Sequence, residues 1–331
     1  MELKSPKPSR LVVLGANLET ETALHALFDA GAAVNGLLTF PSGKNATTSD
    51  YRDLHELAAQ YGVTVVDTTD VNSLQTLGAL RELAPDYLFI LGWSQICRAE
   101  VLSIPRCGSI GTHPSPLPLG RGRAPLPWAI IDGDVRGAVS FFEATLRADA
   151  GPLFHQEFFD IPHGADVTAL YELAIRHLAR GICHVYRRIC NDTLSSVPQD
   201  DARATYRAKR VPADGWIDFS KSAEDVDRLV RAVSRPYPGA YTYYAGRKVK
   251  FWHSRLKPRL AYKGSPGQIL LKRGGELYVQ CCDYPLWLSD AESDGASIEL
   301  SLFCIGERFG YRIEDELYEL KRLLCELLGD R

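Results

Sequence analysis

The sequence predicts an α/β protein in which a parallel sheet with helices on both faces is followed by a small β-barrel and a C-terminal helix. Short apolar strands alternate with amphipathic helices up to about residue 92, and short β-rich runs replace them beyond the Pro-rich turn at 235–240. An amphipathic segment at 312–329 ends the chain. A length of 331 residues allows two domains with a large core.

The alternation in the first part of the chain is the main evidence for the sheet. Its strands are expected at residues 11–15, 33–40, 63–68 and 86–92. Its helices are expected at residues 19–31, 49–62 and 70–83. Apolar strands separated by helices indicate a parallel sheet that is covered on both faces. Ligands of such sheets bind at the carboxyl ends of the strands, so the loops after Gly15, Phe40 and Gly92 are the first candidates.

The rest of the chain completes the expected domain organisation. Further strands at 135–142 and 151–161 precede helices at 165–189 and 222–234. The later runs, such as KVKFWHSRL and ELYVQCC, are separated by Gly, Pro and Asp, which is typical of a small barrel. The expected parts are an N-terminal domain at 1–205, a helical linker at 206–240, a barrel at 241–310 and a terminal helix at 311–331.

The terminal helix carries a leucine stripe at Leu317, Leu320, Leu324 and either Leu327 or Leu328. Apolar residues at this spacing form one face of an amphipathic helix. Two partners for this face remain open, the chain's own barrel and a second copy in a homodimer.

Composition narrows the class of partners. The net charge is −3, from 38 basic and 41 acidic residues, so overall charge gives no indication of a nucleic-acid or membrane partner. The N-terminal segment has no apolar signal-peptide core, and no run of about 18 apolar residues occurs, so we expect a cytoplasmic protein. The eight cysteines contain no C-x-x-C pair and are expected to be reduced thiols.

Common cofactor motifs do not occur. The first strand–helix turn reads GANLETE, not G-x-G-x-x-G, and no G-x-x-x-x-G-K-[ST] segment exists. A nicotinamide dehydrogenase, the reaction class that the α/β domain alone would suggest, therefore has little support. No metal-ligand spacing is found, and we expect no metal.

The segment at 107–128, CGSIGTHPSPLPLGRGRAPLPW, is the strongest candidate for a site. Its prolines and glycines predict an irregular loop that holds side chains rigidly. His113 lies in this segment, and Asp149 lies in a later loop, RADAGP. A histidine that is oriented by a carboxylate is a general acid–base unit. The alternatives for the isolated residues are a structural histidine and a turn aspartate.

The same segment, followed by RADAGP, resembles the folate-dependent formyltransferase family, whose loop has the pattern N-x-H-P-S-L-L-P-x-x-R-G with D-x-G-P downstream. The matching blocks are HPS at 113–115, RG at 121–122, DAGP at 149–152, RAKRVPADGWIDF at 207–219 and DFSKSAEDVDRLVRAVSRPYPGA at 218–240. The likeness spans about residues 10–270. The form RGRAPL-x-W with RADAG is most similar to sugar N-formyltransferases, such as the domain that acts on UDP-aminoarabinose.

The resemblance implies a Rossmann-like domain followed by an OB-like barrel. It implies N10-formyltetrahydrofolate as formyl donor, His113 as general base and Asp149 as the carboxylate that supports it. The donor's pterin is expected to contact the loop after the fourth strand, with the Asp149 loop opposite. The residues of that loop are Leu91, Gly92, Trp93, Ser94, Gln95 and Ile96.

The acceptor is expected to be a UDP- or dTDP-linked amino sugar. Its candidate ligands are Arg121, Arg123, Pro125, Trp128, Arg207, Lys209 and Arg210. For Arg121 the alternative is a residue that only braces the loop, and for Trp128 it is a core residue. The cluster at 207–210 can also be a solvated charge run. Another small amine and initiator tRNA are the alternative acceptors, and the low pI of about 6.3 speaks against tRNA.

One position departs from the family pattern. The family asparagine, two residues before the histidine, is Gly111 here. A side-chain donor to an oxyanion can contribute about 3–4 kcal/mol to transition-state stability. Three outcomes remain open: transfer with a water or the Gly111 N–H in place of the amide, hydrolysis of the formylfolate, and a weak enzyme that serves as a folate- or nucleotide-binding protein.

Overall fold

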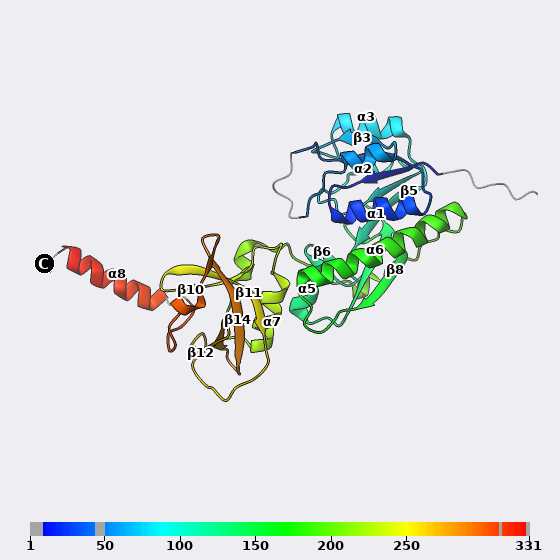
Figure 1. Ribbon diagram of the computed structural model, residues 1–331. Helices are drawn as coiled ribbons and strands as arrows, with labels where there is room; N and C mark the ends of the chain where they lie inside the picture. Colours follow the sequence, from blue (N-terminus) through cyan, green and yellow to red (C-terminus); the bar gives the residue numbers. More distant parts are fainter. Residues whose placement is uncertain (1–8, 44–49, 311–312, 329–331) are drawn as a thin grey trace, which may run out of the picture. The chain divides into compact units, whose positions relative to one another are not determined.

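The computed structural model describes residues 9–43, 50–310 and 313–328, and these residues form two compact units (Figure 1). The division falls between Arg210 and Val211, so that unit 1 ends at Arg210 and unit 2 begins at Val211. The sequence placed the end of the first domain at 205 and a linker at 206–240. In the structure, residues 211–240 belong to the second unit.

A seven-stranded sheet forms the centre of unit 1. Its strands are β1 (Leu11–Leu14), β2 (Val34–Thr39), β3 (Thr64–Asp67), β4 (Tyr87–Ile90), β5 (Gly108–His113), β7 (Arg136–Glu143) and β8 (Leu153–Asp160). The strand order is β3-β2-β1-β4-β5-β7-β8. The first five strands are parallel, whereas β7 and β8 are antiparallel. The expected parallel sheet is therefore mixed at one edge, where β7 runs antiparallel to β5 and residues 144–152 return the chain along β7 as β8.

Helices cover both faces of this sheet, as the alternation predicted. They are α1 (Leu18–Asp29), α2 (His55–Gln60), α3 (Leu74–Leu83), α4 (Ala99–Leu102), α5 (Pro125–Asp132) and α6 (Val167–Cys190). Helices α1 and α6 lie on one side, where α6 packs on β7 and β8, and α3 lies on the other (Figure 1). On the α3 side, Leu77 and Leu80 bury their side chains against Val12 and Leu14 of β1.

The order of the strands reverses at β1, which lies between β2 and β4. Ligands of open α/β sheets bind at the carboxyl ends of the strands beside such a point. The chain is closely packed there, since a β-carbon on Gly15 would collide with the carbonyl oxygen of Leu91. The Asn17 side chain caps α1 by accepting from the Thr20 N–H, which fixes the turn that leaves β1.

The segment at 107–128 is more regular than its composition predicted. Strand β5 occupies Gly108–His113 and helix α5 begins at Pro125. Proline is tolerated at the first helical position because the N–H that it lacks would have no partner there. The irregular part is therefore confined to 114–124, apart from the short strand β6 (Arg121–Gly122), which pairs with β9 (Tyr206–Arg207).

Unit 2 is an antiparallel β domain. Its strands are β10 (Ala240–Tyr244), β11 (Arg247–Arg255), β12 (Ile269–Arg273), β13 (Glu276–Gln280), β14 (Pro285–Ser293) and β15 (Ala296–Ile298). The order is β10-β11-β14-β13-β12, with β15 beside β14. The outer edges of β10 and β12 bond to non-strand segments, through Ile217 to Tyr241 and through Gly306 to Ile269. Helix α7 (Ala223–Ala232) packs on β11. The fold class, an α/β domain followed by an antiparallel β domain and a terminal helix, is confirmed.

Short elements complete the chain. They are the 3-10 turns η1 (Asp201–Arg203), η2 (Pro212–Gly215) and η3 (Leu300–Leu302), and the terminal helix α8 (Ile313–Leu328). The predicted leucine stripe of α8 is exposed, at 52% for Leu317 and 84% for Leu327. Nothing in the structure decides between the two partners expected for this stripe, the chain's own barrel and a second copy, so both stay predictions. Within the described ranges, no helix is both long and apolar enough to cross a membrane.

Candidate functional site

His113 is the last residue of β5, at the carboxyl edge of the sheet. Its side chain is 8% exposed, and its Nε2 lies 2.9 Å from the carbonyl oxygen of Gly120. A carbonyl oxygen only accepts hydrogen bonds, so Nε2 carries the proton. The neutral ring consequently has its lone pair on Nδ1, which makes Nδ1 the basic atom of this side chain.

Asp149 faces that basic atom. Its Oδ1 lies 3.8 Å from Nδ1 of His113, too far for a hydrogen bond but close enough to stabilise a protonated ring. Its Oδ2 accepts from the Gly122 N–H at 2.8 Å, which fixes the carboxylate. The backbone of Asp149 is left-handed (φ 56°), a conformation that aspartate tolerates better than most residues. The structure thus brings together the two residues that the sequence singled out as a pair.

Gly111 lies in β5, two residues before His113 and on the same face of the strand. A β-carbon at this position would lie 2.8 Å from Cζ of Phe142, its cross-strand neighbour in β7. The ring of Phe142 therefore fills the space in which a side chain at residue 111 would lie. Gly111 is paired with Ile90 of β4 and with Phe142 of β7, so its main chain is engaged in the sheet on both sides.

Two polar residues that the sequence analysis missed hold the loop after His113. Ser140 is fully buried, donates to the carbonyl oxygen of Ser115 at 2.6 Å and accepts from the Leu117 N–H at 3.2 Å. The amide of Gln156 donates to Ser140 Oγ and to the Leu117 carbonyl oxygen. These bonds tie the proline-rich loop to β7 and β8. Polar side chains on otherwise apolar strands were the available signal.

Arg121 lies inside the protein, with 0% of its side chain exposed. Its guanidinium donates to Gln199 and Asp201, each at 2.8 Å, and to the hydroxyl of Tyr206 at 3.0 Å. Gln199 in turn donates to the carbonyl oxygen of Asp149. This geometry corresponds to the loop-bracing alternative. Gln199 stands in a polar stretch that carried no recognisable signal.

The other basic candidates gather around α5. Arg207 forms an ion pair with Asp132 and a longer one, at 3.9 Å, with Asp134. The indole of Trp128 donates to the Ala208 carbonyl oxygen at 2.9 Å, and the Arg210 guanidinium lies 4.9 Å from its ring centroid. Trp128 is half-buried, and it packs among arginines. It is neither a core residue nor an open stacking surface.

Arg123 and Lys209 are exposed. Among the described residues the Arg123 side chain has no hydrogen-bond or ion-pair partner, whereas its main-chain N–H donates to the Arg207 carbonyl oxygen. Of the arginines in the loop, Arg123 is therefore the one whose charge is available to a ligand.

The expected donor loop, 91–96, packs against the first turn of the sheet. Gly92 has φ 62°, and a β-carbon there would collide with the Asn17 amide, so only glycine fits without strain. Trp93 packs against Phe40 with the ring centroids 4.6 Å apart and the ring planes tilted by 30°. Its indole N–H is buried without a hydrogen-bond partner in the described part of the chain.

Further along this loop the side chains differ in their freedom. The Gln95 amide bridges to Thr69 and Val71, which anchors the loop. Leu91 is buried, Ser94 is exposed and Ile96 is 67% exposed. The loop is therefore anchored through Gln95 and exposes the apolar side chain of Ile96 next to Ser94.

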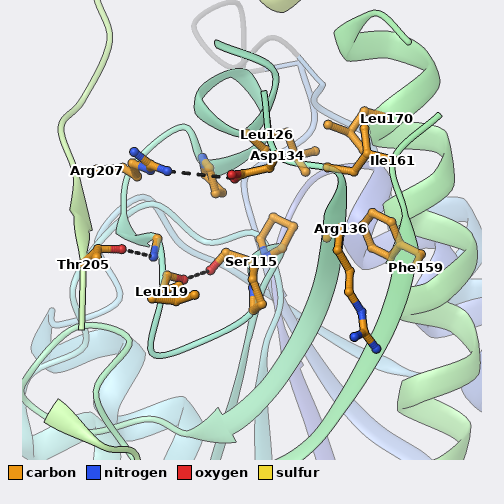
Figure 2. A pocket seen from close by; sticks show the side chains of 16 residues that line it. Ser115, Leu119, Leu126, Asp134, Arg136, Phe159, Ile161, Leu170, Thr205 and Arg207 are labelled. Atoms are coloured by element: carbon orange, nitrogen blue, oxygen red, sulfur yellow. Dashed lines mark hydrogen bonds and ion pairs between the residues drawn. The ribbon is translucent and has the colours of Figure 1, made fainter. Parts of the chain in front are cut away.

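A pocket of about 260 Å³ lies beside the loop at 114–124 (Figure 2). Five of its lining residues, Pro114, Ser115, Pro116, Leu119 and Gly120, follow His113 directly. The opposite walls come from α5, the outer ends of β7 and β8 and the first turn of α6. Of the predicted acceptor ligands, Pro125 and Arg207 line it, whereas the residues of the 91–96 loop do not.

A carboxylate, Glu19, lies next to β5. The hydroxyl of Thr112 donates to Glu19, and burial raises the pKa of Glu19 to about 7, helped by the nearby charge of Asp50. Asp50 itself accepts from the Tyr171 hydroxyl at 2.6 Å and from the Asn17 amide at 3.2 Å. The sequence analysis did not single out this pair. Among the described residues, no group of three or more His, Cys, Asp or Glu is arranged to hold a metal.

The fold and this site define a two-domain α/β protein whose acid–base pair lies at the carboxyl edge of the sheet. Residues 10–182 match the family model described as "Formyl transferase", and residues 209–307 match "Formyl transferase, C-terminal domain". The chain therefore belongs to the formyl transferase family.

Several solved structures are similar to this chain. The structure of HypX from Aquifex aeolicus in complex with tetrahydrofolic acid is 16% identical in sequence to this chain, with a TM-score of 0.62. The match covers 92% of this chain and 51% of the HypX chain. The N-formyltransferase from Helicobacter canadensis, in complex with folinic acid and dTDP-3-aminofucose, is 16% identical with a TM-score of 0.62, and the match covers 86% of this chain and 100% of that one.

WlaRD, a sugar 3N-formyl transferase, is 15% identical to this chain, with a TM-score of 0.63. The match covers 88% of this chain and 99% of the WlaRD chain. The chain spans about half the length of the HypX chains that it matches. At these identities the likeness demonstrates a shared fold.

Proposed function

We propose that this protein transfers a formyl group from N10-formyltetrahydrofolate to the amine of a nucleotide-linked amino sugar. The observation that carries the proposal is the His113–Asp149 pair at the carboxyl edge of the sheet, in a chain of the formyl transferase family. Structures of similar fold that hold tetrahydrofolic acid, folinic acid and dTDP-3-aminofucose support the choice of donor and acceptor.

The acid–base chemistry follows from the tautomer of His113. The acceptor nitrogen attacks the formyl carbon, and the carbonyl π electrons move to oxygen. Nδ1 of His113 takes the proton that the amine loses, and Asp149 stabilises the charged ring. Collapse re-forms the carbonyl and breaks the bond from carbon to N10 of the folate. The leaving nitrogen takes the proton back from Nδ1, so one formamide and one tetrahydrofolate are produced.

In this proposal the two substrates approach the loop at 114–124 from different sides. We place the pterin of the donor against 91–96, where the Trp93 indole N–H is buried without a partner within the described residues. We assign Arg123 to a phosphate of the acceptor, because it is the exposed loop arginine. We propose supporting roles at the acceptor for Lys209 and Arg210. Arg121 braces the loop instead.

The missing amide at residue 111 makes hydrolysis a second candidate reaction. Residue 111 has no side chain, and a β-carbon there would lie 2.8 Å from Cζ of Phe142, so this position supplies no side-chain donor to the formyl oxygen. Without that donor, selectivity for an amine over water must come from binding of the acceptor.

The sequence alone leads us to expect that the transfer takes place in the cytoplasm.

The test is tetrahydrofolate release from N10-formyltetrahydrofolate, without an acceptor and with a panel of UDP- and dTDP-linked amino sugars. Release that requires one acceptor, with a product heavier by one formyl group, would establish the transferase. Acceptor-independent release that no amino sugar accelerates would identify a hydrolase. Binding of the folate without release under any condition would identify a binding protein. His113→Ala serves as the control for contaminating activity.

A further inference from the structure

We propose that Gln199 is a positioning residue for the acid–base pair, and that its side-chain amide holds the loop of Asp149 at the distance from His113 that proton transfer requires. The inference rests on the proposed roles of His113 and Asp149, and it does not depend on which amine accepts the formyl group. It follows from the gap between the two residues, from the backbone of Asp149 and from the groups that surround the Gln199 amide.

The gap between His113 and Asp149 is not closed by a hydrogen bond, because Oδ1 of Asp149 lies 3.8 Å from Nδ1 of His113. His113 is fixed on its own side, since it ends β5 and its Nε2 donates to the Gly120 carbonyl oxygen. The Gly120 N–H in turn donates to Thr205 Oγ1 at 2.8 Å. The attraction between a carboxylate and a protonated ring weakens as the two separate. It therefore depends on the groups that hold Asp149 in place.

Asp149 lies in the connection at 144–152, and its backbone is held in a conformation that costs free energy. Its φ of 56° is left-handed, and a residue other than glycine stays in this region only where its surroundings fix it. The Gly122 N–H fixes the carboxylate. The Gln199 amide fixes the main chain, since its Nε2 donates to the Asp149 carbonyl oxygen at 2.8 Å and to the Gly151 carbonyl oxygen at 2.7 Å. One side chain thus holds the turn on both sides of residue 150.

The groups around the Gln199 side chain match a glutamine and no other residue. Its Nε2 faces two carbonyl oxygens, which only accept hydrogen bonds, and it has one proton for each. Its Oε1 faces the Arg121 guanidinium, which only donates. This complementarity fixes the orientation of the amide. A glutamate would place an oxygen against the two carbonyl oxygens, and an asparagine is shorter by one carbon.

The other end of the amide is anchored to an immobile group. The Arg121 side chain is 0% exposed and also donates to the Asp201 carboxylate at 2.8 Å. Arg121 belongs to the loop at 114–124, into which β5 leads. Gln199 therefore connects the loop of Asp149 to the loop at 114–124, and the length of its side chain sets the spacing between them.

The first test separates catalysis from stability. Gln199→Glu keeps the shape of the side chain and gives Arg121 a charged acceptor, so the melting temperature should not fall. The second carboxylate oxygen faces the carbonyl oxygens of Asp149 and Gly151, which should displace the loop. We expect kcat for tetrahydrofolate release to fall at least about tenfold, because a shift of about 1 Å can cost about 100-fold in rate. An unchanged kcat, or an effect confined to KM, would overturn the proposal.

The second test asks whether Gln199 acts through Asp149. Gln199→Leu removes the amide, and kcat should again fall at least about tenfold. In an Asp149→Asn background the same change should lower the residual kcat less than about twofold, because no charge remains to be positioned. Equal factors in the two backgrounds would show that Gln199 acts on another group and would overturn the proposal.

Gln280 supplies the matched control. It is a buried glutamine of unit 2 whose side chain accepts from the Gly264 N–H at 3.0 Å and donates to the Cys281 carbonyl oxygen at 2.7 Å. Gln280→Leu should lower the melting temperature and leave kcat unchanged. A fall in kcat as large as that of Gln199→Leu would show that loss of stability alone explains both.

A measurement that needs no turnover completes the test. Thermal denaturation shows whether Gln199→Leu is folded, and Gln199→Glu replaces it in both backgrounds if it is not. Loss of folding in both variants would overturn the proposal, since Gln199 would then be a structural residue. If the wild type releases no tetrahydrofolate under any condition, the proposed function fails, and crystal structures decide the positioning role. The distance from Asp149 Oδ1 to His113 Nδ1 should be longer in the folded variant than in the wild type by about 1 Å or more, and an equal distance would overturn the role.

Discussion

The ring of Phe142 and a side chain at residue 111 exclude one another, since a β-carbon on Gly111 would lie 2.8 Å from Cζ of Phe142. Phe142 is 6% exposed and cannot swing into solvent without leaving a cavity. The absence of the family asparagine is therefore not an isolated substitution. Gly111 and Phe142 are a matched pair of residues on two neighbouring strands, β5 and β7.

The pairing predicts that Gly111→Asn alone impairs the protein. Forcing a side chain against the ring should lower the free energy of unfolding by about 1–3 kcal/mol. In a Phe142→Ala background the same change should cost less by at least about 1 kcal/mol, because the ring is gone. Chemical denaturation of the four proteins of this cycle measures the coupling. Additive effects would show that the two positions are independent.

Asp149→Asn isolates the role of the charge in the pair. Asparagine tolerates the left-handed backbone at this position and can still accept from the Gly122 N–H, so the fold should be retained. Loss of the negative charge removes the stabilisation of protonated His113, and we expect the turnover number to fall at least about 100-fold. Steady-state rates with saturating substrates measure this, and a rate within a few-fold of wild type would remove Asp149 from the mechanism.

Substitution of the two loop arginines should affect two different measurements, stability for Arg121 and substrate KM for Arg123. Arg121→Met leaves the Gln199 side-chain oxygen and the Tyr206 hydroxyl without their donor and leaves Asp201 paired with Arg147 alone, and we expect a loss of stability of about 1–3 kcal/mol. Arg123→Met should leave the melting temperature unchanged and raise the KM for the nucleotide sugar. Thermal denaturation and initial rates on both variants give the comparison, and the reverse assignment of the two effects would contradict it.

Glu19 predicts a pH dependence of stability. Its pKa is higher in the folded protein, about 7, than its ordinary value of 4.5, so the folded chain holds this proton more tightly. The stabilisation is present below pH 4.5 and is lost as the pH rises through about 7. The melting temperature should therefore fall more between pH 5 and pH 8 in the wild type than in Glu19→Gln, which keeps an oxygen for Thr112. Equal falls would show that Glu19 does not contribute.

The elements that sequence analysis recovered are those encoded by local pattern. Buried apolar runs located β1 to β4, β7 and β8, and the proline- and glycine-rich composition drew attention to the segment that carries His113. Strand direction is not encoded in such patterns, so the antiparallel edge formed by β7 and β8 was missed. Composition also concealed β5, because glycine fits a strand wherever a neighbour's side chain, here Phe142, covers it.

The parts of the site that were missed depend on long-range contacts. Gln199 reaches Asp149 and Arg121 across about 50 and 80 positions of the chain, and a single sequence contains no signal for such a meeting. The choice between a phosphate ligand and a brace for Arg121 likewise depends on burial, which its polar neighbours in the sequence did not indicate.

The short ladder between β6 and β9 has a practical consequence for dissecting this protein. Arg121 and Gly122 pair with Tyr206 and Arg207. The last residues of unit 1 therefore form a short β-ladder with the loop that follows His113. A truncated version ending at 205 would lose the Tyr206 hydroxyl, the Arg207 main chain and the acceptor for the Trp128 indole. Anyone producing the first unit by itself should place the stop codon after Arg210.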